Sequence, residues 1–240
     1  MKKTFVNQFL IIIFVFVNTI LLGQDSLFVL PLANNLEATI KVKVDKRNEL
    51  CIFNYMIFNN GNSQQNIIEY FLEYDAQIDS ISSPDEWDGR ESNVSKKIIS
   101  WGSLDSTYDI LPNNNLSGFK LLSKCLPKIS KYYLRGEVET PSFSEGEAPD
   151  LSQIVNWDIF GNSLVGFTIS PNEKMFDIEI EPFIDSLLLY IEQSYDIGWL
   201  FQNNTKDKYS NNLRSTKLSL QQNDLLQARI HLENILSEFD

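Results

Sequence analysis

Between residues 38 and 136 the chain repeats short stretches in which apolar and polar side chains alternate. In ATIKVKVDK at 38–46 every second side chain is apolar, and LCIFNYMIF at 50–58 places Cys51, Phe53, Tyr55 and Ile57 on one face. Such alternation is typical of a strand with one buried face. Further β-type runs are predicted at 67–75, 97–103, 106–110, 116–122 and 129–136. Because clusters of Asn, Gly, Pro and Ser separate these runs, they predict an antiparallel sandwich.

After residue 182 the apolar spacing changes to three and four, which predicts short amphipathic helices. The first carries Ile184, Leu187, Leu188, Ile191 and Tyr195, and the second Tyr209, Leu213 and Leu220. The third carries Leu225, Ala228, Leu232, Ile235, Leu236 and Phe239. Gly198 is a stop signal for the first helix, and Asp224 is a cap for the third. Three such helices with tight turns predict a small bundle at 183–240.

The segment between these two patterns is strongly acidic. The stretch EVETPSFSEGEAPD at 137–150 holds five acids, two prolines and no base. Such a composition does not bury apolar surface, and its charges repel one another. We therefore expect a sandwich domain at 24–136, an acidic linker and extended segment at 137–182, and the helical bundle after it.

The N-terminus has the pattern of an export signal. Lys2 and Lys3 precede the apolar run FLIIIFVFV at 9–17, and Gly23 is a small residue at the expected cleavage point. We predict a signal peptide at 1–23 and a secreted or periplasmic protein, with no membrane span after cleavage. A retained N-terminal anchor helix is the alternative, which the shortness of the apolar run disfavours.

The net charge of the protein limits the kinds of molecule that it is expected to bind. The sequence carries −12, and cleavage of the signal peptide with its two lysines takes it to −14. Phosphate backbones and anionic lipids repel so acidic a chain. Nucleic acid is therefore excluded as the expected partner.

Residues 101–136 resemble an immunoglobulin-like sandwich found in uncharacterised secreted bacterial proteins. The pattern consists of a tryptophan strand, a turn with a glycine and phenylalanine after it, and a Tyr-Tyr strand. The matching residues are Trp101, Ile110, Pro112, Leu116, Gly118, Phe119, Leu126, Pro127, Ile129, Tyr132, Tyr133 and Gly136. Asn113 stands where these proteins have glycine, and asparagine also tolerates the left-handed conformation. We therefore expect a turn at Asn113–Asn115; a ligand-binding loop is the alternative.

Residues 183–239 resemble the small helical module called FIMAH, which is appended to many secreted enzymes and adhesive surface proteins. The matched features are the Ile-Gly-Trp turn at 197–199 and the later Ala-x-x-x-Leu-x-x-x-Leu spacing from Ala228. Asn223 again replaces a glycine. The two resemblances imply a mainly β protein with a C-terminal all-α part, and neither family brings an established reaction.

The residues that enzymes use most often are scarce. His231 is the only histidine, and it has no His-x-x-x-His partner for zinc. The sequence contains no Gly-x-Ser-x-Gly elbow, no P-loop and no dinucleotide glycine fingerprint. We predict that the protein is not an enzyme and needs no cofactor.

One acidic cluster is a candidate calcium site. Asp85, Glu86 and Asp88 surround Trp87, and hard carboxylate oxygens suit Ca²⁺. The alternating loop pattern and the terminal bidentate glutamate of a calcium loop are missing, so a solvated acidic turn is favoured.

Aromatic residues in the predicted sandwich are candidate ligand contacts. Trp87, Trp101 and Tyr108 would stack on sugar rings if they share an exposed face. The alternative is that they fill the core, because aromatic side chains are favoured in strands and dominate sandwich interiors.

Two cysteines, Cys51 and Cys125, lie in a chain expected in an oxidising compartment. A disulfide between them would close a loop of about 75 residues and stabilise the domain by about 4 kcal/mol. Free cysteine is also a good core residue. Two separate buried thiols are therefore the favoured interpretation, and the disulfide is the alternative.

These patterns together predict an exported, non-enzymatic binding or scaffold protein with a protein or glycan partner. Two alternatives remain open at this point. One is a carbohydrate-binding or carbohydrate-processing protein that uses the sandwich aromatics. The other is an accessory subunit of a surface assembly.

Overall fold

The computed structural model describes residues 28–92, 97–139, 154–155, 158–175 and 179–237. The chain divides into two compact units, one of 1–32 with 138–162 and one of 33–137 with 163–240. In the smaller unit, strands β1 (Phe28–Val29) and β10 (Ile154–Val155) pair in parallel. The predicted signal peptide at 1–23 and residues 140–150 of the acidic linker lie outside the described residues.

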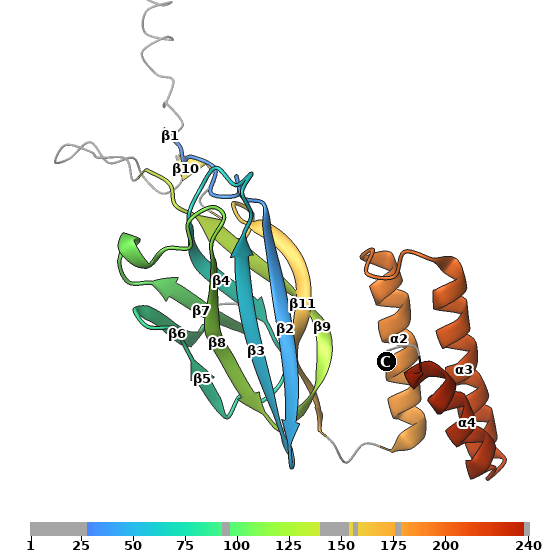
Figure 1. The fold of residues 1–240 in the computed structure, drawn as a ribbon. Helices are drawn as coiled ribbons and strands as arrows, with labels where there is room; N and C mark the ends of the chain where they lie inside the picture. Colours follow the sequence, from blue (N-terminus) through green and yellow to red (C-terminus); the bar gives the residue numbers. More distant parts are fainter. Residues whose placement is uncertain (1–27, 93–96, 140–153, 156–157, 176–178, 238–240) are drawn as a thin grey trace, which may run out of the picture. The chain divides into compact units, whose positions relative to one another are not determined.

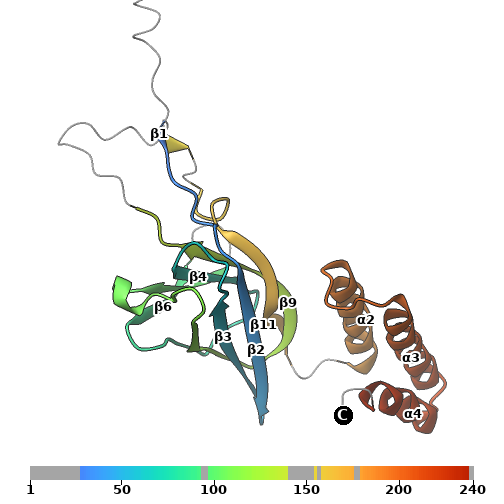
Figure 2. The ribbon, with the colours of Figure 1, turned by 45° about the horizontal axis from the view of Figure 1, so that its top comes forward.

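The larger unit contains a β-sandwich of two antiparallel sheets (Figures 1 and 2). The four-stranded sheet has the order β2 (Ala38–Arg47), β3 (Leu50–Asn59), β8 (Asn115–Ser123), β5 (Ser80–Ser82). The five-stranded sheet has the order β11 (Leu164–Met175), β9 (Cys125–Gly136), β4 (Ile67–Glu73), β7 (Ile98–Ser103), β6 (Trp87–Ser92). The predicted fold class, a mainly β sandwich with C-terminal helices, is confirmed.

The order of the strands is that of an immunoglobulin-like sandwich. β2, β3, β8 and β5 occupy the positions of strands A, B, E and D, while β11, β9 and β4 occupy G, F and C. β7 and β6 extend the second sheet beyond strand C, as in the variable type. The chain departs from that type in two respects. β5 precedes β6 and β7 in sequence, and the later strand, β7, lies next to β4 while β6 forms the edge of the sheet.

Alternation of side chains sets the inner face of the long strands. Along β3, buried and half-buried residues alternate without a break, and Cys51, Phe53, Tyr55 and Ile57 point into the core as predicted. β2 pairs with β3 over its full length, from Ala38 opposite Asn59 to Arg47 opposite Leu50. The reversal between these two strands uses Asn48, whose φ of 56° lies in the left-handed region that asparagine tolerates.

The sandwich extends beyond its predicted end at residue 136. Strand β11, which lies inside the segment predicted to be a linker, pairs with β9 and forms an edge of the five-stranded sheet. Its buried positions include Thr168 and Ser170, whereas Val165 and Phe167 are exposed. At these four positions the polar residues face inward and the apolar ones outward, which obscures the alternation by which a strand is recognised.

The strand predicted at 106–110 is wrong. Residues Ser106–Tyr108 form a 3₁₀ turn, because the carboxylate of Asp105 accepts a hydrogen bond from the Thr107 N–H at 2.9 Å. Only Ile110 makes a β-bridge, with Ile67. Such local side-chain bonds compete with strand pairing.

The asparagine cluster forms the predicted turn. Asn113 has a φ of 65°, and the Asn114 N–H donates to the carbonyl of Leu111 at 3.0 Å. The carbonyl of Asn114 then accepts the N–H of Asn59 at 2.9 Å, which connects the turn to the end of β3.

Aromatic side chains fill the space between the sheets. The rings of Tyr70 and Trp101 stack with centroids 5.0 Å apart, and Phe119 from the opposite sheet meets both edge-on at 5.8 Å. The Tyr55 hydroxyl donates to the carbonyl of Ile169 at 3.0 Å, which ties β3 to β11 across the sandwich. The Tyr70 hydroxyl, also buried, has no hydrogen-bond partner among the described residues.

The C-terminal helices form where they were predicted: α2 (Ile180–Asp196), α3 (Asn203–Gln221) and α4 (Leu225–Leu236). α2 ends before Gly198, which has a φ of 78°, and the Asp224 carboxylate caps α4 by accepting the Gln227 N–H at 3.0 Å. Within the described ranges, none of the helices is both long and apolar enough to cross a membrane.

Both cysteines are buried, and both are free thiols in this structure. Cys51 lies on β3 opposite Ser123, and the Ser123 hydroxyl accepts the backbone N–H of Cys125 at 3.2 Å. Burial raises the pKa of the Cys51 thiol above its ordinary value, although the charge of Lys46 acts in the opposite direction.

The two core tyrosines give a first prediction. Tyr55→Phe removes the bond to Ile169 and is expected to lower the free energy of unfolding by about 1 kcal/mol. Tyr70→Phe removes a buried hydroxyl without a partner, so we expect no loss and a gain of up to about 1 kcal/mol. Urea denaturation of both variants checks this. Equal destabilisation by the two substitutions would show that the Tyr70 hydroxyl does have a partner.

The cysteines give a second prediction. In the folded protein Cys51 is expected to react slowly with a thiol reagent at neutral pH, because burial blocks access and its raised pKa keeps the thiol protonated. Titration of the unfolded, unreduced protein should then find two free thiols. A count of zero there would establish the disulfide instead.

Candidate functional site

The predicted aromatic contacts lie mainly in the core. Trp101 has no exposed surface and Trp87 very little, and both indole N–H groups are used internally. Trp87 donates to the carbonyl of Tyr108 at 3.0 Å, and Trp101 donates to that of Ser82 at 3.1 Å. Tyr108 is 45% exposed. The sugar-stacking hypothesis is therefore wrong for the two tryptophans, which offer no face to a ligand.

The acidic cluster does not converge on a point. Asp85, Glu86 and Asp88 are all exposed where the chain enters β6. Glu86 has a φ of 60°, and its carbonyl accepts the Leu104 N–H at 3.0 Å, so its backbone belongs to a tight turn. In the described part of the chain, no three Asp, Glu, His or Cys side chains form a group that could hold a metal ion.

The helical module, defined as residues 180–237, contains an apolar hollow. α2 and α3 are held side by side by polar pairs at three levels. Lys217 of α3 donates to both carboxylate oxygens of Asp185 at 2.7 and 2.8 Å, and Lys206 pairs with Glu192 at 2.5 Å. At the far end Gln221 donates to Glu181 at 3.0 Å. α4 also packs against α3, so α3 contacts both of the other helices.

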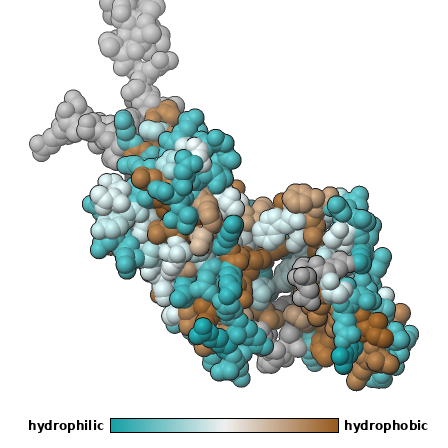
Figure 3. Space-filling view, viewed as in Figure 1, coloured by the Kyte–Doolittle hydropathy of each residue, from teal (hydrophilic) through white to brown (hydrophobic). Residues whose placement is uncertain are grey.

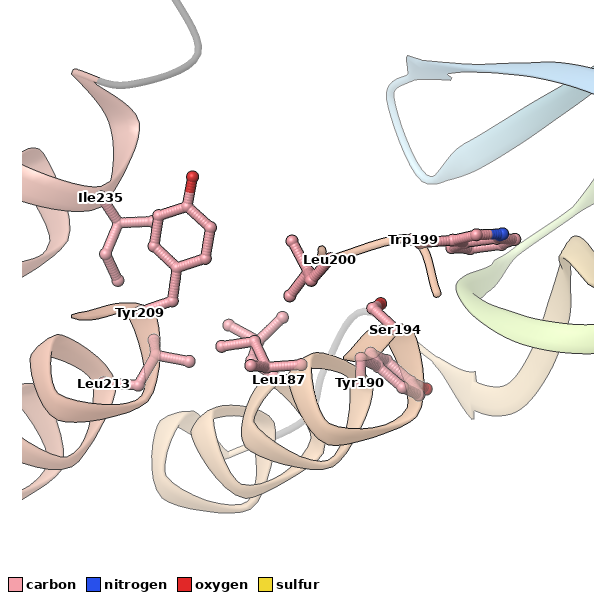
Figure 4. A pocket seen from close by; sticks show the side chains of 9 residues that line it. Leu187, Tyr190, Ser194, Trp199, Leu200, Tyr209, Leu213 and Ile235 are labelled. Atoms are coloured by element: carbon pink, nitrogen blue, oxygen red, sulfur yellow. The ribbon is translucent and has the colours of Figure 1, made fainter. Parts of the chain in front are cut away.

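An apolar groove of about 460 Å³ opens between these helices. Its lining side chains come from all three helices and the turn after α2: Leu187, Tyr190, Ile191, Ser194, Trp199, Leu200, Tyr209, Leu213 and Ile235. Figure 4 shows Leu187, Leu200, Leu213 and Ile235 around the hollow, with the Trp199 ring pointing away from them. The size falls within the range of ligand sites, and the lining is almost wholly apolar.

The turn after α2 contributes to one wall of the groove. The carbonyl of Ser194 accepts the N–H groups of Trp199 at 2.8 Å and Leu200 at 3.1 Å, so the chain turns back over the helix end. This holds Leu200 against the groove. Phe201, the next residue, is 88% exposed and does not line the groove.

The sequence of α3 explains why the groove is open. Four of its side chains are buried, and three of these are small and polar: Ser210, Leu213, Thr216 and Ser219. A middle helix with one buried leucine fills little of the space between its neighbours. Among the described residues of the module, the only buried hydrophobic side chains are Ile184, Leu213 and Ala228.

The apolar residues of the module are instead largely exposed. It holds ten of the eighteen large exposed hydrophobic residues of the described chain: Ile180, Leu189, Trp199, Phe201, Leu218, Leu225, Leu226, Ile230, Leu232 and Leu236. Figure 3 shows apolar surface gathered where α3 and α4 lie in Figure 1. Exposed apolar patches of this kind mark interaction sites.

Sequence reasoning placed Leu187, Leu213 and Ile235 on apolar helix faces but took those faces for a closed core. A signal of the open groove was present in α3. Its buried positions carry Ser and Thr where a helix packed on both sides has Leu, Ile or Ala.

Comparison with known proteins gives little beyond distant structural similarity. No protein-family model and no curated protein matches the sequence. An uncharacterised Nocardia farcinica protein with an immunoglobulin-like fold is 8% identical, with a TM-score of 0.33, over 53% of this chain and 95% of its own.

Two further solved structures are similar at the same level. A cohesin module from a Clostridium perfringens family 33 glycoside hydrolase is 17% identical, with a TM-score of 0.30, over 60% of this chain and 98% of its own. An exo-β-N-acetylglucosaminidase from Vibrio harveyi is 10% identical, with a TM-score of 0.29, over 58% of this chain and 18% of the enzyme. None of these similarities assigns a function to the chain.

The small core of the module gives a third prediction. Leu213→Ala should lower the stability of the three helices by about 2–5 kcal/mol, because Leu213 is one of very few buried apolar side chains there. Leu218→Ala, on the same helix but 56% exposed, should change it by less than about 0.5 kcal/mol. Thermal melting followed by far-UV circular dichroism measures both. Equal shifts would contradict the assignment of Leu213 to the core.

Proposed function

We propose that this chain is an exported, non-enzymatic binding protein, in which the sandwich is a rigid scaffold and the helical module binds a partner. The binding surface is the apolar groove, and its occupant is the apolar face of an amphipathic protein helix. The observation that carries this proposal is the open groove lined by Leu187, Leu213 and Ile235, on a module that buries few apolar side chains of its own.

The walls of the groove favour a helix over an extended peptide. An extended peptide binds by adding its backbone hydrogen bonds to a free sheet edge. The groove is walled by helices, whose backbone groups are already paired within each helix. The backbone hydrogen bonds of a bound helix are made within that helix. Such a ligand needs only apolar contact, which this groove offers.

Two features of the sequence support an extracellular binding role. The pattern of an export signal at 1–23 supports a location outside the cytoplasm, and the resemblance of 183–239 to FIMAH modules supports a role like that of secreted and adhesive proteins. The acidic charge directs the choice toward a protein partner and away from nucleic acid.

Binding of a defined helical probe gives a fourth prediction. The probe is a labelled synthetic 14-residue amphipathic helix with leucines on one face and neutral polar residues elsewhere. We expect saturable binding to the mature chain, measured by fluorescence anisotropy. Leu187→Gln should weaken it at least about tenfold, because a lost leucine contact is worth more than 1.4 kcal/mol.

Leu189→Gln is the matched control, since Leu189 lies on the same helix, is 54% exposed and does not line the groove. It should leave the affinity for the probe unchanged. Unchanged circular dichroism of both variants shows that the helices are intact. If the probe does not bind, or if both variants weaken it equally, the groove is not the binding surface.

A further inference from the structure

The packing of α4 against α3 leaves apolar side chains of α4 exposed. Leu225, Leu232 and Leu236 are spaced by seven and four residues, so they share one helix face, and all three are exposed. We call these three residues the α4 stripe. At helical spacing this face adjoins Ala228, which is buried, and Ile235, which lines the groove. Each chain therefore has both an apolar groove and a helix with an exposed apolar face.

We propose that the occupant of the groove is α4 of a second copy of this chain, so that two chains bind each other through their helical modules. This inference rests on the proposed function, because it names the partner of the same groove. The α4 stripe of each copy lies against the groove of the other, around a two-fold axis. Such reciprocal pairing is the commonest form of closed oligomer.

Reciprocal pairing of two copies covers both the groove and the α4 stripe. A foreign helix in the groove would cover Leu187, Leu213 and Ile235 but would leave the α4 stripe in water. A second copy covers its partner's groove with its own stripe and has its own groove covered in return. Burial of apolar area is the main driving force of association, so the arrangement that buries both surfaces is favoured.

The charges on the two surfaces are compatible with this pairing. α4 carries one Arg229–Glu233 pair, with Nε and Oε1 2.6 Å apart, and no other Asp, Glu, Lys or Arg. Beside the groove, Lys206–Glu192 and Lys217–Asp185 are also paired within the chain. Neither surface brings an uncompensated charge to the interface, where an unpaired charge would be costly. A strongly charged helix would find no counter-charge there.

The length of α4 also fits. Its 12 residues extend about 18 Å, and the groove is built on α2 and α3, which have 17 and 19 residues. A helix of three turns therefore lies within the span of the two helices that form the floor and wall of the groove.

Sedimentation velocity of the mature chain over a range of concentrations tests the proposal. We expect a monomer–dimer equilibrium in the wild type. The double substitution Leu225→Gln with Leu236→Gln should raise the dimer dissociation constant at least about hundredfold, since four leucines leave the symmetric interface. Both residues are exposed in the single chain, so its circular dichroism should match that of the wild type at concentrations where both are monomeric.

The neighbouring residue provides a matched control. Leu226 is 68% exposed and Leu225 is 70% exposed, but their side chains point about 100° apart around the helix. Leu226→Gln should therefore leave the dimer intact. Loss of the dimer in Leu226→Gln to the same extent as in the double variant would overturn the assignment to the α4 stripe.

A second outcome separates this inference from the proposed function. If the wild type is monomeric at every concentration but the synthetic helix still binds in a Leu187-dependent manner, the groove takes a foreign helix and the second copy is rejected. If the wild type dimerises and the dimer is insensitive to Leu187→Gln, the groove is not its interface and the inference is again rejected. Dimerisation that is lost in Leu187→Gln and in the stripe variant supports it.

Discussion

The burial of aromatic rings between two sheets is the interaction on which the sandwich depends. Tyr70 stacks on Trp101 within one sheet, and Phe119 from the other sheet meets both rings edge-on. Because the indole N–H of Trp101 donates a hydrogen bond to the carbonyl of Ser82, the ring is fixed in orientation as well as in position. Because these aromatic side chains fill the core, Tyr70, Trp101 and Phe119 are not available on any binding face of the sandwich.

The helical module, in contrast to the sandwich, buries few apolar side chains. α2 and α3 are joined by exposed ion pairs such as Lys217–Asp185, which contribute little to stability at a solvated surface. The buried face of α3 offers only Leu213 among Ser and Thr side chains. A module with so small a core has little stability of its own. Contact with a partner would therefore stabilise its fold as well as bind it, which couples the two events.

Most of the architecture could be predicted because local pattern and final environment agree. Alternation along 50–58 placed Phe53 and Tyr55 in the core, and Asp224 marked the start of α4. Strand β11 could not be found this way, because its inward positions hold Thr168 and Ser170. The burial of Ser170 is compensated by a partner distant in sequence, because its hydroxyl lies 2.6 Å from that of Ser130. The sequence did not predict the groove for a related reason. The spacing of apolar residues shows which face of a helix is apolar, but it does not show whether another element covers that face.

The distribution of charge decides whether so acidic a chain can associate with itself. Residues 137–179 hold nine acids and one base, whereas residues 180–240, the helical module with the end of the chain, hold nine acids and five bases. Most of the repulsion between two copies therefore originates outside the module, and salt at physiological strength screens it beyond about 8 Å. At the module the remaining charges are largely paired within the chain, as in Lys206–Glu192. Residues 180–240 carry a smaller net negative charge than residues 137–179, so the helical module is the part of the chain that a second copy approaches with less repulsion.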